Sequence, residues 1–308
     1  MGGDLDERDE PVRRGGPAAE TGRKDERMID IPQAELERVV DAALAEDLGV
    51  GDLTASLTIE ADRRAKAAAV AKADVVVAGL EVFATAFRRF DPATDVRLVV
   101  TDGERVGPGA VLAVVEGSAR SVLAAERVAL NFLQRLCGVA TLTRRFVDTV
   151  PAGLSTRILD TRKTTPGLRA LERYAVRCGG GVNHRSDLGG GILIKDNHIV
   201  ACGSVGEAVR RAVRGAGPTQ RVQVEVTTLE QLDEALAAGA TAVLLDNMTP
   251  ERVAEAVQRA AGRAVLEASG GIGPEEVPAY ASAGVDFISA GALTHSAPAA
   301  DISLEFEI

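Results

Sequence analysis

Charged side chains at the ends of short apolar runs are the residues of this sequence best suited to chemistry. Two of them, Lys195 and Glu225, lie within strand-like runs, where a buried charge is costly unless it is paired. Charges of both signs at one pocket suit a substrate with several anionic groups together with a bound metal. The apolar runs in question are TRILDTRK, GILIKDNH, RVQVEVTT, AVLLDNM, AVLEASGG and DFISAG.

The stretch from Asp160 to His198 is basic, although the whole chain carries a net charge of -10. Guanidinium and ammonium groups bind carboxylates and phosphates at roughly 1.5–3 kcal/mol per hydrogen bond. A helix LRALERYAVR with a solvated basic face explains Arg173 and Arg177. It explains Arg162 and Lys163 less well, so these two are predicted to bind anions.

Two glycine-rich turns follow late apolar runs and are predicted to bind phosphate. They are SGGI at residues 269–272 and SAGALT at residues 289–294. Backbone amides of such turns commonly hold a phosphate. Two glycine triplets, at residues 179–181 and 189–191, flank VNHRSDL and let the backbone bend sharply.

The apolar runs alternate with helical segments such as LEQLDEALAAG and PERVAEAVQRAAG. Strand-helix alternation at this spacing predicts a parallel sheet, either doubly wound or closed as a barrel. We favour a barrel with fewer than eight strands. In such barrels the carboxyl ends of the strands meet at one mouth, so the polar groups of all the runs are expected at one pocket.

The first half of the chain has an α+β pattern. PQAELERVVDAALAED has helical spacing and ends at Gly49 and Gly51. Strands are expected in AAAVAKADVVVAG, VRLVV and AVLAVVEG, and a helix in LEVFATAFRRF. A long helical region over residues 121–150 is expected to break at Gly138. Residues 1–27 lack apolar periodicity and are predicted to be a disordered tail.

Composition limits the class of protein. The chain has 308 residues, 46% hydrophobic, 26% charged and 3% aromatic, which fits one large or two smaller soluble domains. The acidic net charge and the few aromatic residues argue against nucleic-acid binding. No apolar run approaches the roughly 20 residues of a membrane span. The three cysteines suggest neither a disulfide framework nor a zinc site, and we expect a cytoplasmic protein.

The sequence resembles the quinolinate phosphoribosyltransferase family from about residue 28 to its end, with segments in the same order and at the same spacing. The resemblance implies an amino-terminal α/β sandwich (residues 28–137 plus 297–308) and an incomplete, six- or seven-stranded α/β barrel (residues 138–296). The matching segments are EDLGVGDLT, ERVALNFLQRLCGVAT, DTRKTTPGLRALERYAVRCGGGVNHRSDL, ILIKDNH, VEVTTLEQ, LLDNM, EASGGI and GVDFISAGALTHS.

The resemblance also implies an activity. The enzyme would transfer the phosphoribosyl group of phosphoribosyl pyrophosphate to quinolinate, with Mg²⁺, giving nicotinate mononucleotide, pyrophosphate and CO2. It would be a homodimer with shared active sites. The implied substrate-binding residues are Arg127, Thr161, Arg162, Lys163, His184, Arg185, Lys195, Glu225, Asp246, Ser269, Gly270, Gly271, Ala290, Gly291 and His295.

Roles follow from the charges of the two substrates. Lys163 and the two glycine-rich turns are expected to bind phosphate and pyrophosphate. Glu225 and Asp246 would face the ribose hydroxyls and the metal, and these two with Lys163 are the predicted catalytic residues. No nucleophilic side chain is needed, so catalysis would rest on positioning and electrostatics. The candidates for the quinolinate carboxylates are Arg127, Arg162, His184, Arg185 and Lys195, with Arg127 supplied by a partner subunit.

Two alternatives remain open from the residues alone. One is a Schiff-base aldolase with Lys195 as the nucleophile, against which the density of arginine argues. The other is a non-enzymatic paralogue that binds a small anion. His198 is expected to fix a loop rather than to ligate a metal, and a site role for His295 is left open.

Overall fold

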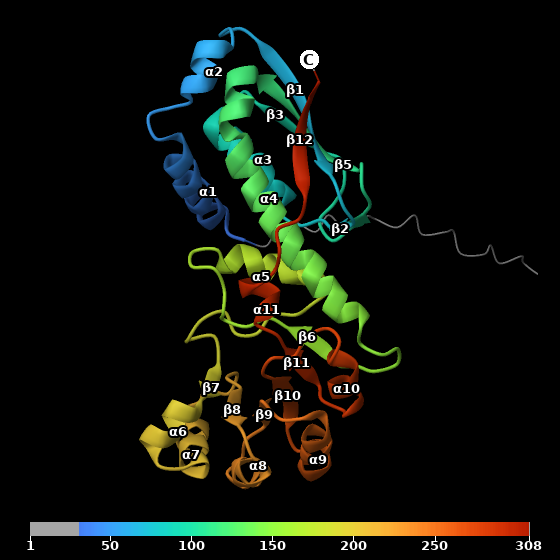
Figure 1. The fold of residues 1–308 in the computed structure, drawn as a ribbon. Helices are drawn as coiled ribbons and strands as arrows, with labels where there is room; N and C mark the ends of the chain where they lie inside the picture. Colours follow the sequence, from blue (N-terminus) through green and yellow to red (C-terminus); the bar gives the residue numbers. More distant parts are fainter. Residues whose placement is uncertain (1–30, 308) are drawn as a thin grey trace, which may run out of the picture.

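The computed structural model describes residues 31–307, which form two sheet-containing parts joined by a long helix (Figure 1). The predicted disordered tail, residues 1–27, lies outside the described residues. The same is true of residues 28–30 and 308, which were assigned to the amino-terminal domain. Among the described residues no helix is both long enough and apolar enough to cross a bilayer.

The amino-terminal part is built on a four-stranded antiparallel sheet in the order β12-β1-β5-β3. The last strand, β12, returns from the far end of the chain to pair with β1 (Figure 1). The predicted helix ending at Gly49 is confirmed, and its apolar stripe is buried. The elements are α1 (Gln33–Leu48), α2 (Leu53–Thr58), β1 (Arg64–Ala71), β2 (Val75–Val76), α3 (Leu80–Phe90), β3 (Asp95–Leu98), β4 (Arg105–Val106), β5 (Val111–Ser118) and β12 (Ile302–Glu307).

Helix α4 (Ala119–Asp148) runs without interruption from the first sheet to the second part of the chain (Figure 1). The predicted break at Gly138 is therefore wrong. A Cβ atom at Gly138 would lie 2.0 Å from the carbonyl oxygen of Pro298. The glycine thus allows the segment that leads to β12 to cross the helix closely. The only cost to the helix is the low helix propensity of glycine.

The second part contains a six-stranded parallel sheet in the order β6-β11-β10-β9-β8-β7. All six predicted apolar runs form strands of this sheet. Its edge strands β6 and β7 do not pair with each other, so the barrel is incomplete, as expected. The strands are β6 (Arg157–Leu159), β7 (Ile192–Ile194), β8 (Val222–Val226), β9 (Ala242–Asp246), β10 (Val265–Ser269) and β11 (Phe287–Ser289).

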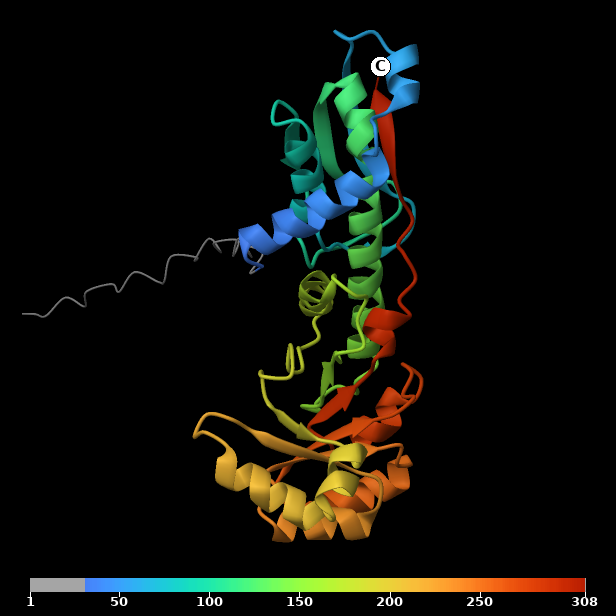
Figure 2. The same cartoon turned by 90° about the vertical axis from the view of Figure 1, so that its left-hand side faces the viewer.

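Helices pack along the outer side of this sheet, while α5 lies between it and the amino-terminal part (Figure 2). Alternation along the strands decides which side chains face inward. In β8 the valines are buried, whereas Glu225 is only partly buried. The register pairs Ser269 of β10 with Asp246 of β9, so both lie at the same end of the sheet. The helices are α5 (Arg169–Cys178), α6 (Asp196–Cys202), α7 (Val205–Gly215), α8 (Leu229–Ala237), α9 (Pro250–Ala260), α10 (Val277–Ser282) and α11 (Ala292–His295).

Candidate active site

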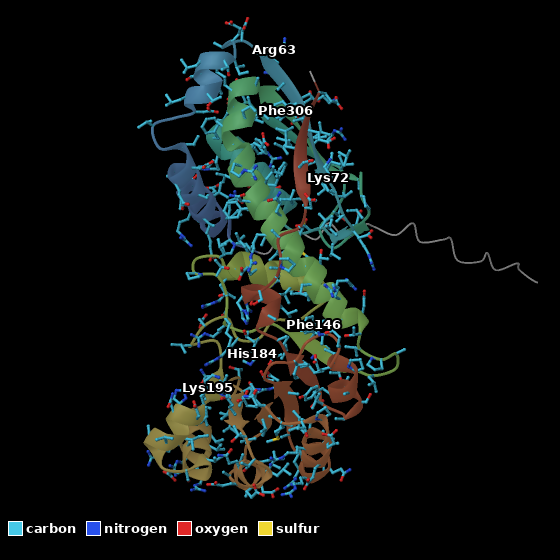
Figure 3. All side chains as sticks on the ribbon, in the orientation of Figure 1. Arg63, Lys72, Phe146, His184, Lys195 and Phe306 are labelled. Atoms are coloured by element: carbon cyan, nitrogen blue, oxygen red, sulfur yellow. The ribbon has the colours of Figure 1, made fainter. Side chains whose placement is uncertain are left out.

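A cavity of about 560 Å³ lies at the carboxyl ends of the strands of the incomplete barrel. His184 and Lys195, two of its lining residues, are found on the side of the six-stranded sheet that faces α5 (Figure 3). The structure thus brings most of the predicted residues together. Those that line the cavity are Thr161, Arg162, Lys163, His184, Arg185, Lys195, Glu225, Asp246, Ser269, Gly270 and Gly271.

Three further predicted residues, Ala290, Gly291 and His295, lie just outside the lining. A Cβ atom at Gly291 would be 3.0 Å from Lys163 Cδ and 3.1 Å from the His295 ring. The turn after β11 therefore packs directly against the Lys163 side chain. Arg127 is different, because it is exposed on α4 and does not line the cavity. A role for Arg127 stays a prediction that depends on a second subunit.

The basic wall of the cavity contains two guanidinium groups, those of Arg162 and Arg185. The Nε atoms of Arg162 and Arg185 are buried and have no hydrogen-bond partner among the described residues. Burial lowers the pKa of Arg185, and the positive charge of Arg162 lowers it further. Arg185 Nη1 donates a hydrogen bond to the carbonyl oxygen of Gly191 at 2.8 Å, which fixes one side of the group. An anion bound in the cavity beside both arginines would relieve the repulsion between their charges.

The positive charge of Lys195 is already paired with the carboxylate of Glu225, which also lines the cavity. Its Nζ lies 2.6 Å from Glu225 Oε2, and the two side chains are 45% and 14% exposed. The backbone N–H of Lys195 donates to His198 Nδ1 at 2.9 Å, at the start of α6. His198 therefore fixes the loop that carries Lys195, as expected.

The acidic wall is formed by Glu225 and Asp246, which lie at the carboxyl ends of the neighbouring strands β8 and β9. Within residues 31–307 there is no cluster of three or more His, Cys, Asp or Glu residues able to hold a metal ion. Mg²⁺ commonly binds proteins through one or two carboxylates and completes its shell with water and substrate phosphates. Two carboxylates beside a glycine-rich turn fit that mode, provided that the substrate supplies the remaining oxygens.

The turn after β10 needs glycine for steric reasons. Gly270 has a φ of 106°, and a Cβ atom there would lie 2.2 Å from Asn247 Oδ1. Asn247 in turn donates from Nδ2 to Asp246 Oδ2 at 2.7 Å. The glycine-rich turn after β10 and the acidic wall are thus built against each other.

Glu267 lies close to the His184 ring and was not among the predicted site residues. The Glu267 residue is 3% exposed, and its Oε2 accepts a hydrogen bond from Gln223 Nε2 at 2.8 Å and lies 3.5 Å from His184 Nε2. Burial raises the pKa of Glu267, but the nearby His184 and the hydrogen bond from Gln223 help to outweigh it and leave the pKa below its ordinary value. The sequence feature that could have identified Glu267 as a site residue is a carboxylate at an inward-facing position of a strand.

Asp160 does not line the cavity but holds the His184 segment in place. Its carboxylate is fully buried and accepts hydrogen bonds from the His184 N–H at 2.7 Å and from Asn183 Nδ2 at 2.6 Å. Burial raises the pKa of Asp160 despite these bonds. Arg173 Nη1 lies 3.6 Å from Asp160 and donates to the His184 carbonyl oxygen at 2.5 Å. The expectation that Arg173 belongs to a solvated face is therefore wrong, because its side chain is only 16% exposed and holds the His184 segment.

Together the fold and the cavity define an incomplete α/β barrel whose mouth is arranged for small, multiply charged anions. Residues 52–137 match the amino-terminal domain of quinolinate phosphoribosyl transferase, and residues 139–305 match its carboxyl-terminal domain. The chain belongs to the quinolinate phosphoribosyltransferase family.

Two curated relatives extend this result. A probable nicotinate-nucleotide pyrophosphorylase [carboxylating] of Bacillus subtilis (strain 168) is 44% identical over 271 residues, which cover 88% of this chain and 93% of the relative. The nicotinate-nucleotide pyrophosphorylase [carboxylating] of Mycobacterium leprae (strain TN) is 45% identical, with 85% and 94% covered. Among solved structures, the nicotinate-nucleotide pyrophosphorylase of Francisella tularensis has a TM-score of 0.86 at 39% identity and covers 91% of this chain and 98% of its own.

Proposed function

We propose that this protein transfers the phosphoribosyl group of phosphoribosyl pyrophosphate to quinolinate and releases pyrophosphate and CO2. The product is nicotinate mononucleotide, an intermediate of de novo NAD biosynthesis. One observation carries the proposal: a single cavity holds a basic wall, an acidic wall and a glycine-rich turn. Membership of the quinolinate phosphoribosyltransferase family supports the same activity.

Quinolinate carries two adjacent carboxylates, and the guanidinium groups of Arg162 and Arg185, which line the same cavity, suit them. Their buried Nε donors have no partner within the described part of the chain, and an unpaired buried donor costs about 1–3 kcal/mol. A dicarboxylate between them would remove that cost. Lys163 and the turn at residues 269–271 line the same cavity and suit the phosphate groups of the second substrate.

The reaction would proceed in two steps that need no covalent enzyme intermediate. The pyridine nitrogen of quinolinate attacks the anomeric carbon as the bond from that carbon to pyrophosphate breaks. The ring is then a pyridinium, which accepts the electron pair left when the neighbouring carboxylate departs as CO2. A proton replaces the carboxylate on the ring. The carboxylates of Glu225 and Asp246 would favour the positive charge that develops at the anomeric carbon.

Mg²⁺ is part of the proposal. Glu225 and Asp246 would hold it, and when bound it would neutralise charge on the departing pyrophosphate. The support is the pair of carboxylates beside the glycine-rich turn at residues 269–271. Removal of Mg²⁺ by chelation is therefore expected to abolish turnover.

We further propose a homodimer in which Arg127 of one subunit completes the site of the other. Arg127 is exposed and lies outside the cavity of its own chain. Helix α2 contacts α4, the helix that carries Arg127, and presents large apolar side chains to solvent: Leu53 is 67% exposed and Leu57 is 84% exposed. Exposed apolar surface of this kind is typical of an interface.

We also propose that the protein acts in the cytoplasm. Its three cysteines form no disulfide among the described residues, which suits a reducing compartment.

The direct test incubates the purified protein with quinolinate, phosphoribosyl pyrophosphate and Mg²⁺ and measures nicotinate mononucleotide and CO2. Stoichiometric formation of both products is the expected result. Nicotinic acid is the control substrate, because it lacks the carboxylate that is lost. Turnover of nicotinic acid in place of quinolinate would overturn the proposal.

Two observations separate the alternatives: trapping with borohydride and a carbonyl substrate for the aldolase, and pyrophosphate release for the anion-binding paralogue. An aldolase would form a Schiff base at Lys195 that borohydride traps, but that ammonium is paired with Glu225 at 2.6 Å. A paralogue that only binds a small anion would retain quinolinate without releasing pyrophosphate.

A further inference from the structure

A buried ion pair behind the cavity joins two segments of the active site. Arg135 lies on α4 and Glu172 on α5, and neither lines the cavity. Arg135 Nη2 is 2.7 Å and its Nε 3.1 Å from Glu172 Oε1. The Glu172 side chain is fully buried, whereas that of Arg135 is 23% exposed. A buried carboxylate is tolerated only when its remaining acceptors are also satisfied.

Glu172 satisfies those acceptors with the loop that carries Lys163. The Thr165 N–H donates to Glu172 Oε2 at 3.0 Å, and the Thr165 hydroxyl donates to Oε1 at 2.7 Å. Both carboxylate oxygens are therefore used, one of them by the loop and the guanidinium together. The carboxylate fixes the end of the segment 161–165, in which three residues line the cavity.

Arg135 holds the second segment, which comprises α11 and the residues that directly follow it. Its Nη1 donates to the Ala297 carbonyl oxygen at 2.8 Å, and its Nη2 donates to the Thr294 carbonyl oxygen. The Thr294 hydroxyl, which is fully buried, donates to the carbonyl oxygen of Lys163 at 2.8 Å. The two segments are thus bonded to each other as well as to the ion pair.

We propose that Arg135 and Glu172 are positioning residues of this active site. Their ion pair locks the Lys163 loop against α11, which places the Lys163 ammonium for the phosphate groups of the second substrate. The packing of Gly291 against the Lys163 side chain shows how close the two segments are, with 3.0 Å from a Gly291 Cβ position to Lys163 Cδ. The inference rests on the proposed function, because it takes Lys163 to bind phosphoribosyl pyrophosphate.

The first test is Glu172→Gln with Tyr174→Phe as the matched control. Glutamine keeps the shape but presents an NH2 group where the carboxylate accepts a bond. Tyr174 lies on the same helix, is 6% exposed and donates from its hydroxyl to Asp102 Oδ2 at 2.7 Å. The control therefore removes a buried hydrogen bond from α5 without touching either site segment.

The variants are compared by steady-state kinetics and by hydrogen exchange of the ligand-free proteins. Misplacement of a catalytic group by about 1 Å can cost on the order of 100-fold. Glu172→Gln is expected to lose about 10- to 100-fold in kcat/KM and to show faster exchange in residues 161–168 and 291–297. Tyr174→Phe is expected to keep wild-type kcat/KM and wild-type exchange in these two segments.

A milder pair of variants covers the case in which Glu172→Gln does not fold. Thr294→Val removes the hydroxyl that holds the Lys163 carbonyl, whereas Thr294→Ser keeps it. Thr294→Val is expected to raise the KM for phosphoribosyl pyrophosphate more than the KM for quinolinate, and Thr294→Ser to restore both. A residue with a merely structural role would not produce this split.

The inference is overturned if Thr294→Val has the KM values of the wild type, or if exchange in the two segments rises as much in Tyr174→Phe as in Glu172→Gln. These outcomes are distinct from a failure of the proposed function. In that case the wild-type protein forms no nicotinate mononucleotide, while hydrogen exchange of the ligand-free variants still decides whether the ion pair locks the two segments.

Discussion

Mixing two inactive variants tests whether Arg127 acts in the site of a partner subunit. In the single chain, Arg127 is exposed on α4 and absent from the cavity lining. It precedes Arg135, the α4 residue bonded to the site segments, by eight residues (135 − 127), which is about 12 Å of helix. The perturbations are Arg127→Ala in one subunit and Lys195→Ala in the other.

The expected magnitude follows from twofold symmetry. Random mixing in equal amounts gives heterodimers as about half of all dimers, and a shared site makes one of the two sites in each heterodimer fully intact. The mixture should therefore recover about a quarter of wild-type activity. If Arg127 acted within its own chain, every site would carry one defect and no activity would return.

The assay is pyrophosphate release after unfolding and refolding the mixed subunits, with differently tagged chains to verify heterodimers by mass. Each variant is also refolded alone as a control and should remain inactive. Verified heterodimers without recovered activity would refute the shared site.

Three further outcomes are expected from single side chains. Gly270→Ala should abolish activity, because its Cβ would lie 2.2 Å from Asn247 Oδ1 and the backbone φ is 106°; wild-type kcat/KM in this variant would contradict the role of the turn. The pKa of Glu267 lies below its ordinary value of 4.5, so its contribution to stability is present above that pH and is lost as pH falls through the lower folded-state pKa. Urea unfolding of Glu267→Gln should accordingly show lower stability at neutral pH and a weaker decline in acid, and an unchanged pH slope would count against this assignment. Burial raises the pKa of the Cys137 thiol to about 12, so iodoacetamide should leave Cys137 unmodified in the native protein, as read by peptide mass.

The strands of the barrel could be predicted because each one is a short apolar run whose burial is decided locally. The same is true of α1, whose buried stripe is visible as helical spacing. Gly138 misled the prediction because the reason for that glycine is not local. It lies where a segment distant in sequence, at Pro298, crosses α4. Helix propensity describes how readily a residue adopts helical backbone, whereas the contact that requires glycine at this position appears only in the folded chain.

Arg135 and Glu172 show a second limit of sequence reasoning. Both lie on helices with mixed polarity, and a charged residue there is usually solvated. Only the packing of α4 against α5 encloses the Glu172 side chain completely. Arg173 was misjudged for the same reason, since it bonds the His184 carbonyl oxygen instead of facing solvent.

The content of the site was predictable, but the pairing of its charges was not. Alternation along a strand tells which side chains face the interior, and the carboxyl ends of the strands bring them to one mouth. Which of them meet depends on how far the incomplete barrel closes. Lys195 is paired with Glu225 at 2.6 Å, while the Nε atoms of Arg162 and Arg185 have no hydrogen-bond partner among the described residues. An incoming dicarboxylate gains most where positive charges already repel each other, so we expect Arg162 and Arg185, rather than Lys195, to be the stronger initial site for quinolinate.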